Sequence, residues 1–306
     1  MSIRTKALRS LAALAAGCSL VAPALAQTAH KIADIEYARA GEHALKLDLY
    51  LPASEHAPLL VWLHGGGWEA GSKERMPLAP LVDRGYAVAS LDFQPASTAR
   101  FPGQLHEIKA ALRYLRSAAV RHGYDADRIG ILGESSGGHL ASLVGTTNGQ
   151  PDLEGTLGEH LGTSSEVHAI VSYFGASDLL TILAQSTPYG VGVRTPALKR
   201  LLGALPEENE TLARLASPVF QVDARDPPLL LLHGDQDPQM PINQSHELEG
   251  AYERVGLDAK LIVVHGAGHG GAAFYDPERT ALVAAFLDEH LRRDLATEPS
   301  AAVARP

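Results

Sequence analysis

The sequence is poor in cysteine: it contains only Cys18, which lies in a segment with the composition of a secretory leader. This segment, residues 1–26, has a basic start, a short apolar run and an Ala-Leu-Ala sequence, so we expect cleavage after Ala26. The mature chain would then have no thiol, which excludes disulfides, cysteine nucleophiles and thiolate metal sites. In an alternative interpretation Cys18 follows a lipoprotein signal and carries the lipid. Both alternatives predict export, to the periplasm or the medium.

Long apolar runs, clustered metal ligands and phosphate-binding loops are also missing. The apolar part of the leader is too short for a stable membrane span. The 14 histidines are scattered, and the sequence contains neither an H-E-x-x-H pattern nor a G-x-x-x-x-G-K-[ST] loop. We therefore expect no metal and no other cofactor.

An excess of basic residues is missing as well, since the formal net charge is −9 at pH 7. An acidic chain is a poor candidate for binding nucleic acid, whose phosphates attract lysine and arginine. The charge also disfavours strongly anionic substrates, although a local basic patch could override this. The sequence does not determine the oligomeric state.

What the sequence does contain is an alternation of strand and helix patterns. Strands are expected at 43–52, 58–67, 86–93, 127–133, 167–175, 227–235 and 259–267, and helices at 104–123, 136–147, 241–255 and 278–293. This alternation predicts an α/β domain, over 27–294, with a mainly parallel sheet and helices on both faces. Residues 177–226 interrupt the alternation with proline and glycine, and we interpret them as a small lid. Residues 295–306 are expected to be a disordered tail.

A G-x-S-x-G motif stands between a predicted strand and a predicted helix. Ser135 has Gly133 two residues before it and Gly137 two residues after it, which meets the steric requirement of a nucleophile elbow. Ser136 fails the same requirement because Glu134 lies two residues before it. The alternative is a tight turn that needs small residues and has no catalytic role.

A serine hydroxyl is a weak nucleophile until a neighbouring base takes its proton. In this arrangement of strands and helices, a carboxylate and then a histidine follow the serine on later strand ends. His269 lies in a loop beyond its strand and is favoured over His265, which lies at the strand end. Asp237 is favoured over Asp235, because Asp235 follows the strand directly and suits a turn-capping role.

The HGGGW segment, residues 64–68, follows a buried strand and predicts an oxyanion hole. Glycine-rich backbone can direct N–H groups at a developing negative charge without obstruction by side chains. The expected donors are the backbone N–H groups of Gly66, Gly67, Trp68 and Ser136. The alternative is a flexible glycine loop. His64 and His139 are expected to hold loops by hydrogen bonds and not to take part in the chemistry.

A resemblance to the α/β-hydrolase fold rests on four motifs in order: HGGGW, GESSGGHLASLVG, SPVFQVDARDPPLLLLHGDQDPQMP and GAGHG. Within that fold residues 40–293 are most similar to the bifunctional acetylxylan esterase/feruloyl esterase group and to hormone-sensitive-lipase-like carboxylesterases. The resemblance implies that Ser135 is the nucleophile, His269 the general base and acid, and Asp237 the orienting carboxylate. It also implies acetyl or feruloyl esters of plant polysaccharide as substrates. Residues 92–94 are Asp-Phe-Gln where relatives often have Asp-Tyr-Arg, so the family's pocket is not carried over there.

The expected function is a secreted serine hydrolase that cleaves small or polysaccharide-linked carboxylic esters through an acyl-enzyme. Because the histidine must be neutral to accept a proton, activity should rise with pH through roughly 6–7. Two other classes stay open. One is a serine amidase on the same fold, either a peptidase or an arylformamidase, and the other is a catalytically inactive binding module.

Overall fold

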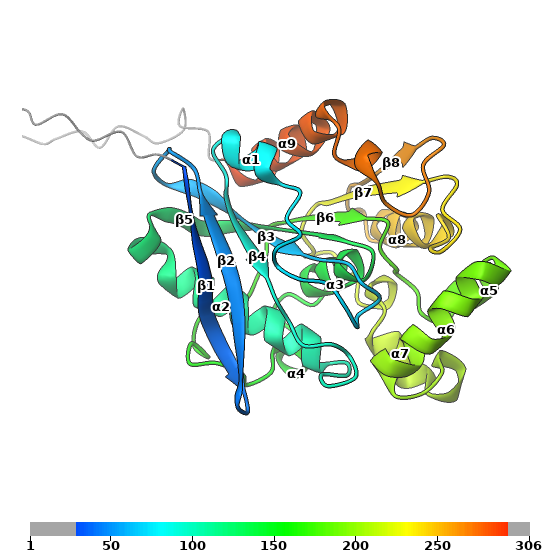
Figure 1. The fold of residues 1–306 in the computed structure, drawn as a ribbon. Coiled ribbons are helices and arrows are strands. Elements are labelled where there is room, and N and C mark those ends of the chain that lie inside the picture. The colour runs from blue at the N-terminus through cyan, green and yellow to red at the C-terminus, as the bar shows by residue number, and fades with distance from the viewer. Residues whose placement is uncertain (1–28, 293–306) are drawn as a thin grey trace, which may run out of the picture.

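The computed structural model describes residues 29–292, so the predicted leader and the predicted tail lie outside the described residues. The described chain forms an eight-stranded sheet in the order β1-β2-β4-β3-β5-β6-β7-β8 (Figure 1). The strands are β1 (His30–Ala40), β2 (His43–Leu51), β3 (Ala57–Leu63), β4 (Ala87–Leu91), β5 (Tyr124–Glu134), β6 (Ala169–Tyr173), β7 (Leu229–Gly234) and β8 (Ala259–Val264). The β1–β2 and β2–β4 pairs are antiparallel, and all other neighbours pair in parallel. The prediction of a mainly parallel sheet is confirmed.

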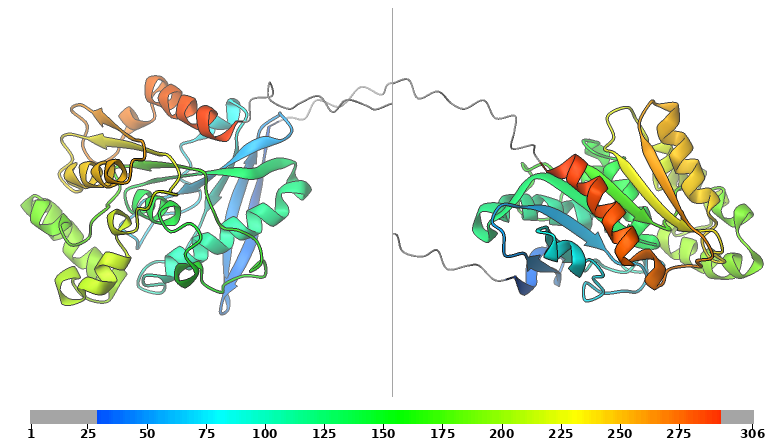
Figure 2. Two further views of the ribbon diagram at one scale, coloured as in Figure 1. Left: turned by 180° about the vertical axis from the view of Figure 1, so that it is seen from behind. Right: turned by 90° about the horizontal axis from the view of Figure 1, so that it is seen from above.

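Helices cover both faces of the sheet, as Figures 1 and 2 show. They are α1 (Ala79–Asp83), α2 (Gly103–His122), α3 (Ser136–Gly145), α4 (Pro151–Glu154), α8 (Asn243–Arg254) and α9 (Pro277–Leu291). α1 and α9 pack on one face, and α2, α3 and α8 pack on the other. The continuous apolar run of β3 follows from this, because Val61 faces one core while Leu60 and Trp62 face the other. Within the described residues no helix has the length and apolar character needed to cross a membrane.

Two differences between the described chain and the predicted elements have a clear physical reason. The strand predicted over 58–67 ends at Leu63, and the glycines after it form a loop. β1 was not expected, because the pairing of β1 with β2 shifts register between Ile32 and Ile35, where Asp34 has a φ of 57°. Each β-bulge adds a residue and breaks the alternation of period two by which a strand is recognised.

Between β6 and β7 the chain forms a group of short helices at one end of the molecule (Figure 1). They are α5 (Ile182–Gln185), α6 (Pro188–Leu202) and α7 (Glu210–Leu215), with the 3₁₀ turns η1 (Pro206–Glu208) and η2 (Pro218–Phe220). Thr187 caps the start of α6 by accepting a hydrogen bond from the N–H of Gly190, and Gly203 ends the helix in the left-handed region. Leu198 and Leu201 of α6 are fully buried, so this segment shares the core of the sheet.

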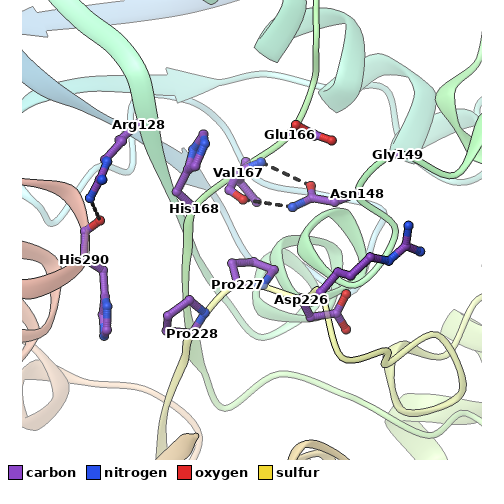
Figure 3. Close-up of a pocket in the computed structure, with 11 residues that line it drawn as sticks. Arg128, Asn148, Gly149, Glu166, Val167, His168, Asp226, Pro227, Pro228 and His290 are labelled. Atoms are coloured by element: carbon purple, nitrogen blue, oxygen red, sulfur yellow. Dashed lines mark hydrogen bonds between the residues drawn. The ribbon is translucent and has the colours of Figure 1, made fainter. Parts of the chain in front are cut away.

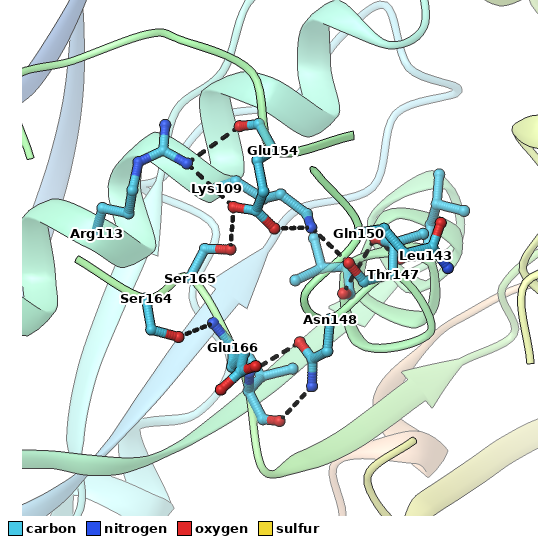
Figure 4. Close-up of polar contacts among 12 residues, drawn as sticks. Lys109, Arg113, Leu143, Thr147, Asn148, Gln150, Glu154, Ser164, Ser165 and Glu166 are labelled. Carbon is cyan, nitrogen blue, oxygen red and sulfur yellow. Dashed lines mark hydrogen bonds and ion pairs between the residues drawn. The ribbon is translucent and has the colours of Figure 1, made fainter. Parts of the chain in front are cut away.

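The connection from α3 to β6 is held by a buried lysine of α2 (Figure 4). Lys109 Nζ donates to the carbonyl oxygen of Thr147 at 2.8 Å and to Glu154 Oε1 at 2.6 Å. Arg113 and Ser165 donate to the other oxygen of the same carboxylate. The buried ammonium is therefore satisfied, and α4 is fastened to α2.

Candidate active site

The turn between β5 and α3 brings Ser135 to the carboxyl edge of the sheet. Ser135 has a φ of 51° and a ψ of −117°, a left-handed conformation that non-glycine residues seldom adopt. A Cβ atom on Gly133 would lie 2.3 Å from the carbonyl oxygen of Gly137, and one on Gly137 would lie 2.2 Å from that of Leu63. Both flanking residues must therefore be glycine. Ser136 is the first residue of α3, and its side chain is buried behind the turn.

Ser135 lies at the end of a chain of hydrogen bonds that crosses three loops. Its Oγ is 2.8 Å from Nε2 of His269, in the loop after β8. Nδ1 of His269 is in turn 2.6 Å from Oδ2 of Asp237, in the loop after β7. The structure thus brings together the three residues favoured from the sequence, in the order nucleophile, base and carboxylate that acyl transfer requires.

The environment of Asp237 keeps this carboxylate ionised. Its side chain is fully buried, and burial alone would raise its pKa. The rings of His233 and His269 outweigh this effect and hold the pKa of Asp237 well below its usual range. The second oxygen, Oδ1, accepts hydrogen bonds from the backbone N–H groups of Gln239 and Met240. The carboxylate is fixed on both sides, so it can orient the imidazole and stabilise its charged form.

The alternative residues His265 and Asp235 pair with each other and not with the serine. Nδ1 of His265 is 2.8 Å from Oδ2 of Asp235, and the N–H of Gly266 donates to Oδ1. The His265 side chain is 82% exposed. This pair stabilises the turn after β8, and the structure does not bring it to Ser135.

The glycine loop after β3 carries unpaired backbone donors. Gly66, Gly67 and Trp68 all have positive φ, and a Cβ atom on Gly66 would lie 2.0 Å from the carbonyl oxygen of Ala70. The N–H groups of these three residues donate no hydrogen bond to the described residues. Ser136 is the first residue of α3, so its backbone N–H has no carbonyl acceptor within the helix. Gly66 and Gly67 line the same cavity as Ser135, whereas Trp68 is buried behind the loop.

Two histidines hold loops around the site, as expected from the sequence. Nδ1 of His139 accepts a hydrogen bond from the Trp68 indole at 3.1 Å, and its Nε2 donates to the carbonyl oxygen of Ala216 at 2.7 Å. Burial lowers the pKa of His139 to about 4, although the hydrogen bond to Ala216 acts in the other direction. His64 stacks on Phe93 with ring centroids 4.3 Å apart. His139 therefore links the glycine loop after β3 to the segment between β6 and β7.

The serine opens into a cavity of about 500 Å³, within the range of small-ligand sites. Phe174, which directly follows β6, packs edge-on against the His269 ring with centroids 4.9 Å apart and has a φ of 41°. The charged residues of the lining are Glu69, Arg75, Glu134, Arg194 and Arg200. Sequence analysis missed Phe174 and the charged lining. The rule that sites form at the carboxyl ends of strands could have found Phe174, because it stands at such an end.

A second cavity of about 510 Å³ lies at the opposite edge of the sheet, where β5, β6 and β7 begin (Figure 3). Its lining in the described chain includes no serine, threonine or cysteine. Several of its groups bond to backbone: Asn148 exchanges two hydrogen bonds with Val167, and Arg128 donates to the carbonyl oxygen of His290. This cavity therefore offers no hydroxyl or thiol nucleophile, unlike the cavity at the carboxyl edge, which contains Ser135. In the described part of the chain no group of three histidine, aspartate or glutamate side chains is arranged to hold a metal ion.

Gln94, which stands where the resembling family often has an arginine, is joined to the glycine loop after β3 through Gln104, whose amide donates to the carbonyl oxygens of Gln94 and Trp68. The backbone N–H of Gln94 donates to Oε2 of Glu107 at 2.8 Å. Glu107 is 3% exposed, and burial raises its pKa to about 7 even though the hydrogen bond from Gln94 acts against this. Among the described residues no cation contributes to the pKa of this buried carboxyl group.

Comparison with known proteins identifies the family. The BD-FAE family profile matches residues 47–252. The esterase LipC of Mycobacterium tuberculosis is 29% identical over 70% of this chain and 53% of its own length. The chain spans about half the length of the curated relatives it matches.

Two solved structures cover more of the fold. A truncated carbohydrate esterase from gut microbiota is 33% identical, with a TM-score of 0.77, over 87% of this chain and 98% of its own. An acetyl ester-xyloside bifunctional hydrolase from Caldicellulosiruptor lactoaceticus is 25% identical, with a TM-score of 0.67, over 81% of this chain and 89% of its own. These matches confirm the predicted α/β-hydrolase fold, and the chain belongs to the BD-FAE family.

Proposed function

We propose that this protein hydrolyses carboxylic esters through an acyl-enzyme formed on Ser135. The observation that carries the proposal is the chain of short hydrogen bonds from Ser135 Oγ through His269 to the buried Asp237. It begins at a strained turn and opens into a cavity that unpaired backbone N–H groups also line. A structural serine would need neither the strain nor the aligned base.

The geometry supports the following reaction. His269 accepts the hydroxyl proton as Ser135 Oγ attacks the ester carbonyl, and the N–H groups of Gly66, Gly67 and Ser136 bind the oxyanion. His269 then gives the proton to the leaving alcohol, and the carbonyl re-forms as an acyl-enzyme. Water repeats the two steps, releasing the acid and restoring the serine. Asp237 stays ionised throughout, because its pKa lies far below that of a histidine.

We propose acetyl or feruloyl esters of plant polysaccharide, or similar small esters, as the substrates. Two findings support this choice: the family match, and the similarity to a carbohydrate esterase and to an acetyl ester-xyloside hydrolase. The cavity of about 500 Å³ admits a small acyl group together with part of a sugar. The composition of residues 1–26 further supports export of the enzyme.

Labelling by a fluorophosphonate tests the nucleophile. We expect one label per chain on the unaltered protein, no label on Ser135→Ala and full labelling of Ser136→Ala, which is the matched control. A label that persisted in Ser135→Ala and vanished in Ser136→Ala would contradict the choice of serine. An unaltered protein that took no label would instead favour an inactive binding module.

A substrate panel tests the reaction class. It comprises acetylated xylan, methyl ferulate, nitrophenyl esters of increasing chain length, and peptide nitroanilides. We expect turnover of the esters, with kcat/KM falling as the nitrophenyl acyl chain lengthens. Faster turnover of the nitroanilides than of nitrophenyl acetate would show an amidase instead.

Sequencing of the exported protein tests the leader. A mature N-terminus at Gln27, in the periplasm or the medium, is expected. A lipid-modified N-terminus at Cys18 would show an anchored lipoprotein, and an uncleaved cytoplasmic protein would contradict export.

A further inference from the structure

Arg194, on helix α6, is a buried cation with unused hydrogen-bond donors. Its side chain is 2% exposed. Nη2 donates to Oε1 of Gln239 at 3.3 Å, but Nε and Nη1 are buried with no partner among the described residues. Burying a charged guanidinium with two nitrogens unpaired is costly. All donors of this guanidinium can be paired only when a further hydrogen-bond acceptor binds next to it.

The space beside Arg194 is the cavity of the nucleophile. Val193, Arg194, Ala197 and Arg200 line that cavity together with Ser135, at spacings that place them on one face of α6. Helix α6 lies with α5 and α7 to one side of the sheet in Figure 1. The guanidinium therefore lies at the wall of this cavity, with its two unpaired nitrogens buried beside the space that a bound substrate would fill.

The nearest buried carboxylate does not satisfy this arginine. Both oxygens of Asp237 already accept hydrogen bonds, Oδ1 from the backbone of residues 239 and 240 and Oδ2 from His269. The charge of Asp237 favours the protonated guanidinium, although burial lowers the pKa of Arg194 overall. Asp237 thus contributes to keeping the cation in place without occupying its free nitrogens.

The charges of the cavity favour an anion. Its lining contains three arginines and two glutamates, and one of these glutamates, Glu134, accepts a hydrogen bond from the Tyr275 hydroxyl. The amide nitrogen of Gln239, a residue that also lines the cavity, has no acceptor among the described residues. With one more cation than anion in its lining, the cavity departs from the overall net charge of −9 of the chain.

We propose that Arg194 and Gln239 form a subsite for a carboxylate on the substrate, so that the preferred esters carry this group close to the scissile bond. The planar guanidinium can bind a carboxylate through two parallel hydrogen bonds. A neutral ester leaves these buried donors unpaired and is therefore disfavoured. This inference rests on the proposed esterase activity and adds a preference to it.

Matched pairs of esters test the subsite. One pair has the carboxylate on the acyl side: mono(4-nitrophenyl) succinate and its methyl ester. The other has it on the alcohol side: 4-acetoxybenzoate and 4-acetoxybenzamide. Since a hydrogen bond to a charged group contributes about 1.5–3 kcal/mol, we expect kcat/KM to favour the carboxylate of at least one pair by about 10-fold or more. The pair that shows the preference identifies the side on which the subsite lies.

Substitution tests the residue. Arg194→Met should remove the preference, lowering kcat/KM for the carboxylate ester more than for its neutral partner and mainly through KM, and Arg194→Lys should restore part of it. Lys199→Met is the control, because Lys199 is an exposed cation on the same helix outside the cavity. Should Arg194→Met fail to fold, inhibition of the unaltered enzyme decides, and succinate should inhibit more strongly than succinamide.

The outcomes separate this inference from the proposed function. Turnover of the neutral esters without any preference for the carboxylate in either pair, or equal losses on charged and neutral esters in Arg194→Met, would overturn the subsite alone. Absence of turnover for every ester would overturn the esterase as well.

Discussion

His139 makes stability depend on pH in a way that can be calculated from its contacts. Its Nδ1 accepts from the Trp68 indole, a group that can only donate, and its Nε2 donates to the carbonyl oxygen of Ala216. Protonation would place a second N–H against the indole N–H. Burial favours the neutral ring and lowers its pKa in the folded protein to about 4, against the effect of the hydrogen bond to Ala216, whereas the unfolded chain protonates the ring near its ordinary value of 6.5.

The magnitude follows from linkage. Above pH 6.5 the ring is neutral in both states, and the full stability is present. As the pH falls from 6.5 to 4 the unfolded state binds the proton first, so the free energy of unfolding decreases, by about 3 kcal/mol in total and by about 2 kcal/mol between pH 7.5 and 5.0. Glu107 has the opposite effect on the free energy of unfolding. Because its pKa in the folded protein is about 7, the folded state binds a proton first as the pH falls, and the free energy of unfolding increases.

The effects of His139 and Glu107 on the free energy of unfolding nearly cancel between pH 7.5 and 5.0. The test is therefore the difference in this free energy between the unaltered protein and a variant at His139. Urea unfolding followed by circular dichroism gives the free energy of unfolding at each pH. His139→Gln keeps a donor and an acceptor but cannot take the proton, so its disadvantage relative to the unaltered protein should shrink by about 2 kcal/mol on acidification. His43→Gln, which replaces an exposed histidine, is the control. A disadvantage of His139→Gln that stayed constant with pH would refute the reasoning.

Three further predictions follow from other contacts. Gly137→Ala places a Cβ atom against a backbone oxygen of β3, so it should lower the free energy of unfolding by about 3 kcal/mol and prevent labelling by the fluorophosphonate. The control Gly162→Ala, whose Cβ atom would lie in open space, should do neither. Normal labelling of Gly137→Ala would contradict this prediction. Asp237→Asn should leave a folded protein whose kcat falls about 10⁴-fold, since the amide stabilises the wrong histidine tautomer; a loss below tenfold in steady-state kinetics would exclude the proposed role. Gln94→Arg should pair with Glu107 and raise the free energy of unfolding by about 1–3 kcal/mol at pH 8. The gain should be much smaller at pH 5, because the carboxyl group ionises between these two pH values. Equal gains at both pH values in urea unfolding would show that no pair forms.

The parts of the fold and site that could be predicted are those set by local sterics and burial. Continuous apolar runs marked the central strands, because a strand buried on both faces has no polar positions. Glycine spacing distinguished Ser135 from Ser136, since the clash that forbids a side chain at Gly137 involves backbone that any such turn brings together. His269 and Asp237 followed from their positions beyond strand ends.

The parts that could not be predicted depend on contacts between distant segments. β1 was not predicted, because its bulges break the period-two alternation of apolar and polar residues by which a strand is recognised. Arg194 lies in an amphipathic helix whose placement over the nucleophile is determined by packing, and its sequence neighbourhood resembles that of any surface arginine. Glu107 likewise lies in a regular helix pattern, and only its depth in the fold makes its carboxyl group unusual.

The buried Lys109 has a consequence for engineering the chain. Because its ammonium fastens Thr147 and Glu154 to α2, the part of the connection between these two residues should resist cutting and rearrangement as the core does. Proteases should pass over it, and inserted tags or new chain ends placed there should unfold the domain. The helices between β6 and β7 supply Arg194 to the cavity, so this is the segment in which a designer would alter the cavity.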